Sequence, residues 1–322
     1  MSTRIALTAR IQQYLAERRR LGFELKSSGL VLASFARYVA LVRHRGPLTA
    51  EVMADWARQV RGGERGAAAR RLMTLRPFAR WLQQFEPRTA VPDEPVFGPE
   101  PGRVAPHIYQ DDEIVQLLAA ARALPPADSL RSVTYQTLFG LLASSGLRIS
   151  EALVLRDADV DLKAGVLTIR QTKFAKSRSV PVHATTIQAL ARYRQLRSSQ
   201  IPTAADMRFF VGTRGRRRGQ PLSDRQVHRV FAQLREQMGW INRGAHAAVR
   251  VHDLRHTFAV RRLIRWYEQG VDIDPQMLAL STYLGHVKIS YTYWYLSGVP
   301  DLVKLAGSRF EQFAVSPEPD HG

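Results

Sequence analysis

The chain of 322 residues contains no cysteine. Without thiols it can form no disulfide, no thiolate nucleophile and no zinc site with cysteine ligands. Its apolar runs are all far shorter than the ~20 residues that span a bilayer, and its first residues lack the apolar core of a signal peptide. These absences predict a cytoplasmic protein that does not enter a membrane.

Lysine is scarce in a chain that is strongly basic. Lys+Arg total 47 against 28 Asp+Glu, which gives a formal net charge of +19. Such an excess predicts a polyanionic partner, and nucleic acid fits best. A membrane surface is the alternative, but the basic residues are spread over both halves instead of one amphipathic helix. The six lysines are Lys26, Lys163, Lys173, Lys176, Lys288 and Lys304.

A lysine kept among 41 arginines indicates a role that positive charge alone does not fill. An ammonium group can release a proton near neutral pH when its pKa is lowered, whereas a guanidinium cannot. This argument points to Lys173 and Lys176, in the basic segment QTKFAKSR.

The first half predicts a small helical bundle, residues 1–88. Apolar residues recur at helical spacing, and Ser28 and Thr49 are predicted N-caps. Residues 89–106 are rich in proline and predict a stiff linker. The predicted helices span residues 5–20, 28–42, 49–60 and 66–85. Their arginines are candidates for contact with a phosphate backbone, with a solvated helix face as the equal alternative.

The second half, residues 107–322, predicts helices around one small antiparallel sheet. Two alternating segments, 166–170 and 179–182, predict short strands joined by the basic turn that carries Lys173. Helices are expected at residues 110–123, 129–144, 147–155, 223–238 and 253–269, with another opened by Asp274-Pro275. The fold class is therefore mainly α, in two domains, with a small antiparallel sheet.

Two arginines have the properties that cleavage of a phosphodiester requires. In-line attack concentrates negative charge on the non-bridging oxygens, and a guanidinium can bond two of them while staying protonated. Arg148, in GLRISE, follows the Ser145-Gly146 break at a helix start, and Arg255, in VHDLRH, lies on the first turn of a helix. A single arginine is more often a surface charge than a catalytic residue. Arg148 and Arg255 are catalytic candidates only because they occur together with the other motifs.

His252 and Arg255 lie three residues apart on one helical face, where both can address one phosphate. His252 and His256 are also spaced like the ligands of an H-E-x-x-H zinc site, with Asp253 in place of the glutamate. No third ligand follows at a known spacing. A hydrogen-bonded structural role is the third alternative, and we favour it for His256.

The nucleophile and the acid have candidates of their own. A phenol can bond to phosphorus and be expelled again, and Tyr291, Tyr293 and Tyr295 crowd one short helix. An aromatic core is the alternative for all three, and spacing alone leaves Tyr291 and Tyr295, which share a face. Lys173 is the candidate general acid for the departing 5′ oxygen, and an exposed hairpin lysine is its alternative.

These motifs, in this order, resemble the tyrosine recombinase (phage integrase-like) family over residues 107–315. The resemblance implies a helical core-binding domain and a catalytic domain that clamp DNA between them. It selects Tyr295 by its spacing from His286 in LGH, and Glu151 as the acidic neighbour of Arg148. It implies cleavage through a 3′-phosphotyrosyl link without metal or cofactor. The implied catalytic residues are Tyr295, Arg148, Lys173, His252, Arg255 and His286.

The resemblance also implies a partner and an assembly. Double-stranded DNA is the expected substrate, bound by four protomers on two paired sites, in some cases beside related recombinases. The function implied is that of a site-specific recombinase or integrase of a mobile element. The expected DNA-backbone contacts are Lys176, Arg178, Arg214, Arg216, Arg217 and Arg218.

Three other functions remain open from the sequence: an inactive DNA-binding accessory protein, a type IB topoisomerase and a zinc hydrolase. An apolar helix predicted at residues 300–313 can dock into a neighbouring protomer or pack on its own domain.

Overall fold

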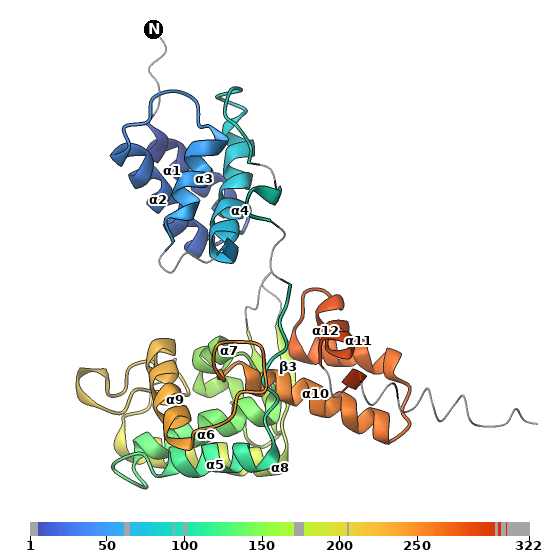
Figure 1. The fold of residues 1–322 in the computed structure, drawn as a ribbon. Helices are drawn as coiled ribbons and strands as arrows, with labels where there is room; N and C mark the ends of the chain where they lie inside the picture. Colours follow the sequence, from blue (N-terminus) through green and yellow to red (C-terminus); the bar gives the residue numbers. More distant parts are fainter. Residues whose placement is uncertain are drawn as a thin grey trace, which may run out of the picture. The chain divides into compact units, whose positions relative to one another are not determined.

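The computed structural model describes residues 6–60, 65–92, 94–98, 102–170, 177–204, 206–299, 302–303 and 307. The chain divides into two compact units, Met1–Gly102 and Arg103–Gly322, each of which we describe by itself (Figure 1). The boundary falls inside the predicted linker. Both ends of that linker are packed, since η1 contacts α4 of the first unit and residues 105–109 are bonded into the second.

The described part of the first unit is a bundle of four α-helices and one 3-10 helix. Its core is aromatic: the ring centroids of Phe35 and Trp56 lie 5.2 Å apart, and those of Tyr14 and Phe78 lie 5.5 Å apart. The elements are α1 (Leu7–Arg20), α2 (Lys26–Leu41), α3 (Ala50–Arg58), α4 (Arg65–Leu82) and η1 (Glu94–Phe97).

All four predicted helices of this unit are present, but one predicted cap is wrong. The Thr49 side chain accepts a hydrogen bond from the Val52 N–H and caps α3, as predicted. Ser28 does not cap α2, because the helix begins two residues earlier, at Lys26, after Leu25 in the left-handed conformation (φ 46°). A serine or threonine acts as an N-cap only where its own backbone is outside the helical conformation and the next residues begin the helix.

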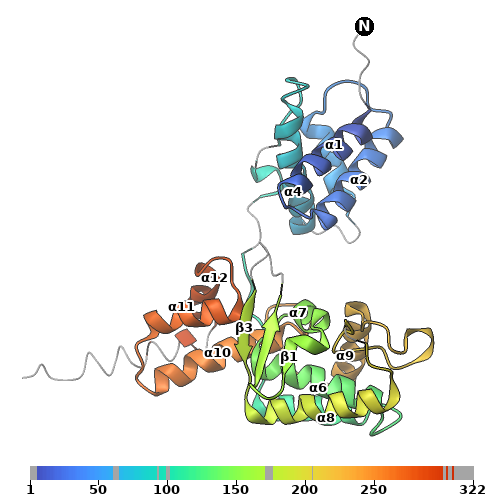
Figure 2. The ribbon, with the colours of Figure 1, turned by 180° about the vertical axis from the view of Figure 1, so that it is seen from behind.

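The second unit packs its helices around α6, which is buried along most of its length and contacts α5, α8 and α10 (Figures 1 and 2). Helix α8 was not predicted; its apolar residues are sparse, and few of its side chains are buried. The helices are α5 (Asp111–Arg122), α6 (Leu130–Ser145), α7 (Ile149–Val154), η2 (Asp157–Asp159), α8 (Ala184–Gln200), η3 (Gly215–Arg217), α9 (Asp224–Met238), α10 (Asp253–Glu268), α11 (Ile273–Leu284) and α12 (Ser290–Gly298).

The sheet has three antiparallel strands in the order β1-β2-β3. The strands are β1 (Val160–Asp161), β2 (Val166–Ile169) and β3 (Arg178–Pro181). In the register, Leu167 pairs with Val180, and both side chains are buried. Strand β1 was not predicted, because two residues are too short for alternation to be visible. The turn with Lys173 and Lys176 lies outside the described residues.

The predicted fold class, mainly α with a small antiparallel sheet, is confirmed. Within the described part of the chain, no helix has both the length and the apolar character needed to cross a bilayer.

Candidate active site

Two glycines end helices one or two residues before two predicted site residues. Helix α6 ends at Gly146 (φ 61°), and a Cβ there would lie 2.6 Å from the ring of Phe258. Helix α11 ends at Gly285 (φ 66°), where a Cβ would lie 2.7 Å from a guanidinium nitrogen of β3. Only glycine fits both the conformation and the space. The sharp turns place Arg148 at the start of α7 and His286 just after α11.

The two predicted arginines converge on one backbone carbonyl. The Leu284 oxygen accepts hydrogen bonds from Arg148 at 3.4 Å and from Arg255 at 2.8 Å. Arg148 also donates to the Gly285 oxygen, and Arg255 to the Gly146 oxygen. Each guanidinium has five N–H donors, so these backbone bonds leave donors for an anion. Burial, with Arg148 nearby, lowers the pKa of Arg255 from its usual value.

Glu151 accepts hydrogen bonds from both Arg148 and Arg178 and so links the two arginines. The carboxylate accepts from the Arg148 backbone N–H at 3.0 Å and from its guanidinium at 2.9 Å. It also accepts two bonds from the Arg178 guanidinium, which donates further to the Tyr283 oxygen. Burial would raise the pKa of Glu151, but these arginines outweigh it and hold the pKa below its usual value.

Arg178 therefore differs from its predicted role as a contact to the DNA backbone. Its side chain is only 11% exposed, and its guanidinium is committed to Glu151 and to the end of α11. These contacts leave the Arg178 side chain little exposed surface with which to contact a DNA backbone. Its physical role is to tie β3, α7 and α11 together under the site.

The predicted histidines face the same arginines. His286 shares a hydrogen bond of 2.7 Å between its Nδ1 and the Thr292 Oγ1. Burial lowers the pKa of His286 to about 3, with Arg255 and Arg148 acting in the same direction. His252 is exposed to the pocket, and its partial desolvation and the charge of Arg255 lower its pKa as well. Both rings are neutral at neutral pH.

Of the three tyrosines on α12, only Tyr295 is buried, at 1% exposure. Tyr293 is 37% exposed and donates its hydroxyl to the Asp274 carboxylate at 3.0 Å. Tyr291 is 38% exposed, with its ring beside His286. Burial raises the pKa of Tyr295, and the charge of Arg255 partly offsets this. The Tyr295 phenol is therefore protonated and points inward.

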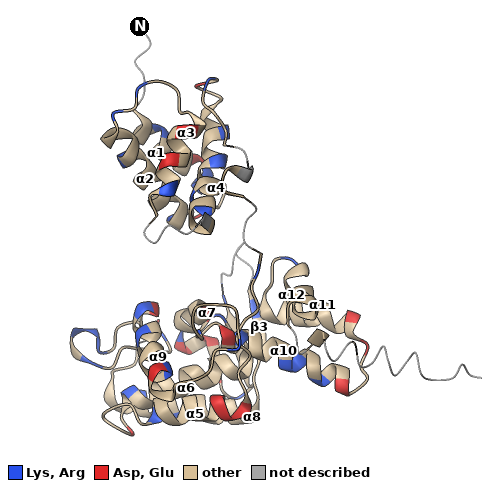
Figure 3. Cartoon of the chain, viewed as in Figure 1, with Lys and Arg blue, Asp and Glu red and all other residues tan. Residues whose placement is uncertain are grey.

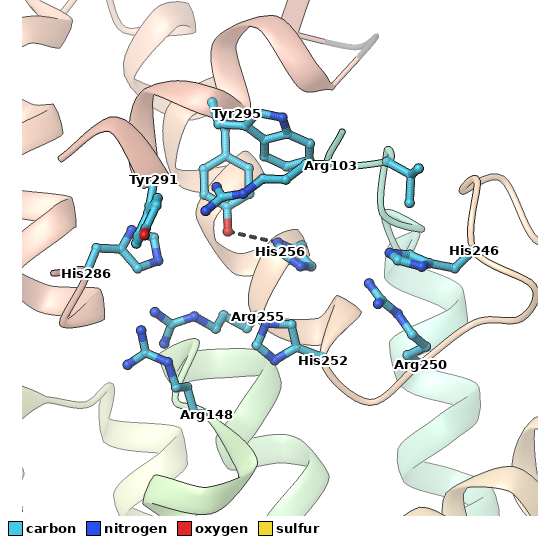
Figure 4. Close-up of a pocket in the computed structure, with 12 residues that line it drawn as sticks. Arg103, Arg148, His246, Arg250, His252, Arg255, His256, His286, Tyr291 and Tyr295 are labelled. Atoms are coloured by element: carbon cyan, nitrogen blue, oxygen red, sulfur yellow. Dashed lines mark hydrogen bonds between the residues drawn. The ribbon is translucent and has the colours of Figure 1, made fainter. Parts of the chain in front are cut away.

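One pocket collects these side chains (Figure 4). Tyr295 points from α12 toward the arginines, and the labelled side chains surround the same space. The pocket unites five of the six predicted catalytic residues, and Lys173 lies outside the described residues. Its lining consists of Arg103, Val104, Arg148, His246, Arg250, His252, Arg255, His256, His286, Tyr291, Trp294 and Tyr295.

Two lining residues outside α12 contact its tyrosines and were not predicted as part of the site. His256 was predicted to have a hydrogen-bonded structural role, and the partner that the sequence did not indicate is Tyr295, whose hydroxyl oxygen lies 2.9 Å from the His256 Nδ1. Its position four residues after His252 was the available signal. Arg103 lies in the predicted linker, and its guanidinium sits 4.4 Å from the Tyr291 ring centroid and 5.8 Å from that of Trp294. No pattern in the sequence marks Arg103.

The basic loop before α9 lies elsewhere in the unit. Arg214 donates to the Pro125 oxygen, and Arg218 donates to the Gln200 oxygen at 3.1 Å. Arg216 and Arg217 are exposed on the short η3 helix. Helix α9 and helices α11 and α12 lie at opposite ends of the unit in both views (Figures 1 and 2), and Figure 3 shows basic residues near α9. The loop can therefore contact only a ligand that extends well beyond the pocket.

The zinc alternative gains no support from the geometry. Among the described residues, no three or more histidine, aspartate or glutamate side chains form a group that could hold a metal ion. The Asp253 carboxylate, which would replace the glutamate of the zinc motif, is paired with Arg250 at 2.7 Å.

Comparisons with known proteins agree with the fold. The profile of the Phage integrase family matches residues 108–298. The chain is 39% identical over 306 residues to "Putative integrase/recombinase y4rB" of Sinorhizobium fredii, covering 94% of this chain and 96% of the relative. It is 30% identical over 240 residues to "Tyrosine recombinase XerC" of Thermodesulfovibrio yellowstonii, covering 73% and 72%.

A solved structure shows the same fold at low identity. The Tn1549 transposon integrase, in complex with a circular intermediate DNA, aligns with a TM-score of 0.66 at 17% identity, over 95% of this chain and 100% of that one. The fold and pocket define an enzyme of the tyrosine recombinase type. The chain belongs to the phage integrase family.

Proposed function

We propose that the chain is a site-specific recombinase of a mobile element, which cuts and rejoins double-stranded DNA through a 3′-phosphotyrosyl link to Tyr295. The observation that carries this proposal is the convergence of the Tyr295 hydroxyl, Arg148, Arg255 and His286 on one pocket. A buried phenol, two fixed guanidinium groups and neutral imidazoles are the set that metal-free transfer of a phosphodiester needs.

The proposed reaction exchanges one phosphoester for another. The Tyr295 oxygen bonds to phosphorus as its proton passes to solvent water, while the bond from phosphorus to the 5′ oxygen breaks. Arg148 and Arg255 hold the non-bridging oxygens, where negative charge grows. Lys173, proposed from the sequence, gives its proton to the 5′ oxygen. Attack by a 5′ hydroxyl of a second duplex then releases Tyr295 and rejoins the strand.

Charge and the relatives support DNA as the substrate. The net charge of +19 favours a long polyanion, and Arg214, Arg216, Arg217 and Arg218 are exposed at a distance from the pocket. The solved relative is named as a transposon integrase bound to DNA, which supports the proposal of a mobile element. Rejoining two cut duplexes requires four active sites, so we propose a tetramer on paired sites.

A trapping experiment tests the proposal. Wild-type protein and Tyr295→Phe are incubated with nicked duplexes taken from the DNA that flanks the gene. The nick lets the cleaved fragment diffuse away, so the covalent complex accumulates. We expect an adduct that survives boiling in detergent for wild type and none for Tyr295→Phe, with equal DNA binding by both.

Three outcomes contradict the proposal. An adduct with both proteins moves the nucleophile to another residue, with Tyr291 as the pocket-lining candidate. Sequence-specific binding by both without any adduct favours a DNA-binding accessory protein. Relaxation of supercoiled DNA without a specific site would indicate a topoisomerase.

A further inference from the structure

The proposed nucleophile has one hydrogen-bond partner among the described residues. The Tyr295 hydroxyl oxygen lies 2.9 Å from the Nδ1 of His256. This histidine belongs to α10, directly after Arg255 and one turn beyond His252. The bond therefore joins α12, which carries the phenol, to the helix that carries a predicted phosphate ligand.

The hydrogen bond between Tyr295 and His256 contributes to stability because the Tyr295 hydroxyl is buried. Tyr295 is 1% exposed, and a buried hydroxyl without a partner would cost about 1–3 kcal/mol. The His256 ring is itself confined, with its centroid 4.9 Å from that of His252 and 6.4 Å from that of Trp294. Two confined rings joined by one bond leave the phenol little freedom to rotate.

The direction of the bond follows from the protonation states. Burial lowers the pKa of His256 to about 2, with His252 and Arg250 acting in the same direction, so the ring is neutral. Tyr295 keeps its proton, because burial raises its pKa. A neutral imidazole has one accepting nitrogen, and the phenol O–H needs an acceptor. Nδ1 therefore accepts from the hydroxyl, and Nε2 carries the ring proton.

We propose that His256 is a positioning residue for the nucleophile: it accepts the Tyr295 hydroxyl proton in a hydrogen bond and fixes the phenol oxygen at the phosphate pocket. This inference rests on the proposed function. His256 and Arg255 are neighbours on one turn of α10. The same helix therefore sets the position of the attacking oxygen relative to the phosphate. A misplacement of about 1 Å in such a geometry can cost ~100-fold in rate.

Three variants distinguish the effect of the hydrogen-bond acceptor at residue 256 from the effect of the volume that its side chain fills. His256→Asn keeps an acceptor near the place of Nδ1 and has no titratable ring. His256→Phe fills the space and removes the acceptor. His228→Asn replaces an exposed histidine on α9 and is the matched control. Each protein is assayed for DNA binding, for its unfolding midpoint and for the single-turnover rate of adduct formation on a nicked duplex.

We expect His256→Phe to form the adduct roughly 10- to 100-fold more slowly than wild type, with DNA binding unchanged. His256→Asn should stay within a few-fold of wild type, and His228→Asn should equal it. Equal rates for wild type and His256→Phe would overturn the inference. A faster His256→Phe would also overturn it, because the bond would then restrain Tyr295 instead of positioning it.

A modified substrate distinguishes the nucleophile side of the reaction from the leaving-group side. Sulfur in place of the bridging 5′ oxygen gives a thiolate leaving group, which needs no proton. We expect the defect of His256→Phe to persist on this substrate and that of Lys173→Ala to be largely rescued. Rescue of His256→Phe would instead assign His256 to the leaving group and overturn the proposed role.

A spectroscopic readout tests the contact without DNA and without activity. In ¹⁵N-histidine NMR of the full chain, the His256 signals are assigned by their loss in His256→Asn. We expect an Nε2–H tautomer whose Nδ1 resonance moves in Tyr295→Phe. An unmoved resonance overturns the inference. If the resonance moves but wild type forms no adduct on any duplex, the contact stands, and the proposed function fails instead.

Discussion

The Arg178 guanidinium donates two hydrogen bonds to the Glu151 carboxylate, at 3.0 and 2.9 Å, beneath the pocket. Both side chains are nearly buried, at 11% and 10% exposure. Glu151 in turn binds Arg148, so the pair sets the position of an arginine that lines the pocket. A residue predicted to contact DNA thus supports the site from within the fold.

Removal of Arg178 should destabilise the second unit strongly. Arg178→Met leaves the Glu151 carboxylate buried with one partner fewer, and breaking such a pair costs about 3–5 kcal/mol. Arg122→Met is the control, because Arg122 and its partner Asp128 are 47% and 72% exposed, and an exposed pair contributes about 0–1 kcal/mol. Urea unfolding measures both, and equal losses would contradict the structural role of Arg178.

Arg103 should stabilise the position of α12 through its cation–π contacts with Tyr291 and Trp294. Such a contact contributes about 0.5–2 kcal/mol, so we expect Arg103→Ala to slow adduct formation by up to roughly 10-fold. Arg103→Lys keeps the charge but loses the planar stacking group, and it should recover only part of the rate. Single-turnover cleavage at saturating DNA measures this. A wild-type rate for Arg103→Ala would exclude the role.

The basic loop should contribute to binding and not to chemistry. Each phosphate contact that is lost reduces the slope of log K against log salt by about 0.9 on B-DNA. Arg216→Ser and Arg217→Ser are therefore each expected to flatten the salt dependence by about one unit and to leave cleavage at saturating DNA unchanged. Filter binding from low to moderate salt gives the slope. Unchanged slopes would place η3 away from the DNA.

Acid should destabilise the DNA-free protein through its buried histidines. The folded pKa values of His256 and His286, about 2 and about 3, lie below the unfolded value near 6.5. The contribution of these two neutral histidines to the free energy of unfolding is therefore complete above pH 6.5. It is lost as the pH falls, because the histidines of the unfolded chain take up protons at a higher pH than those of the folded chain. Each histidine should lower the free energy of unfolding by about 1–2 kcal/mol between pH 7 and pH 5.

Urea unfolding at the two pH values checks this with a variant and a control. His286→Asn can keep the contact to Thr292 without a titratable group, so its stability should fall less on acidification than that of wild type. His228→Asn, at an exposed position, should fall as much as wild type. Glu151 does not interfere, since its pKa lies below its usual value and it stays charged at pH 5. Parallel losses in all three proteins would contradict the account.

The sequence predicted the parts of the site that depend on local spacing. The glycines before Arg148 and His286 and the helical interval from His252 to Arg255 are local signals, and the structure places these four side chains on one pocket. Arg103 could not be found this way, because its partners on α12 lie about 190 residues further along the chain and no periodicity links them.

Arg178 and His256 show the opposite limitation. Both were assigned by residue type: an arginine near a basic turn was predicted to contact DNA, and the second histidine was predicted to have a hydrogen-bonded structural role. Their roles depend on the partner that the fold supplies, which is a buried carboxylate for Arg178 and a phenol for His256. Strand β1 and helix α8 were missed for a simpler reason, since one is very short and the other has little apolar periodicity.

The most direct test of the central claim is the identity of the residue that carries the DNA. The trapped adduct is digested with protease and nuclease, and the nucleotide-bearing peptide is sequenced by mass spectrometry. The account predicts a nucleotide joined through its 3′ phosphate to Tyr295, in the peptide that also contains Tyr291 and Tyr293. A link to either of those tyrosines, or a link through a 5′ phosphate, would contradict it.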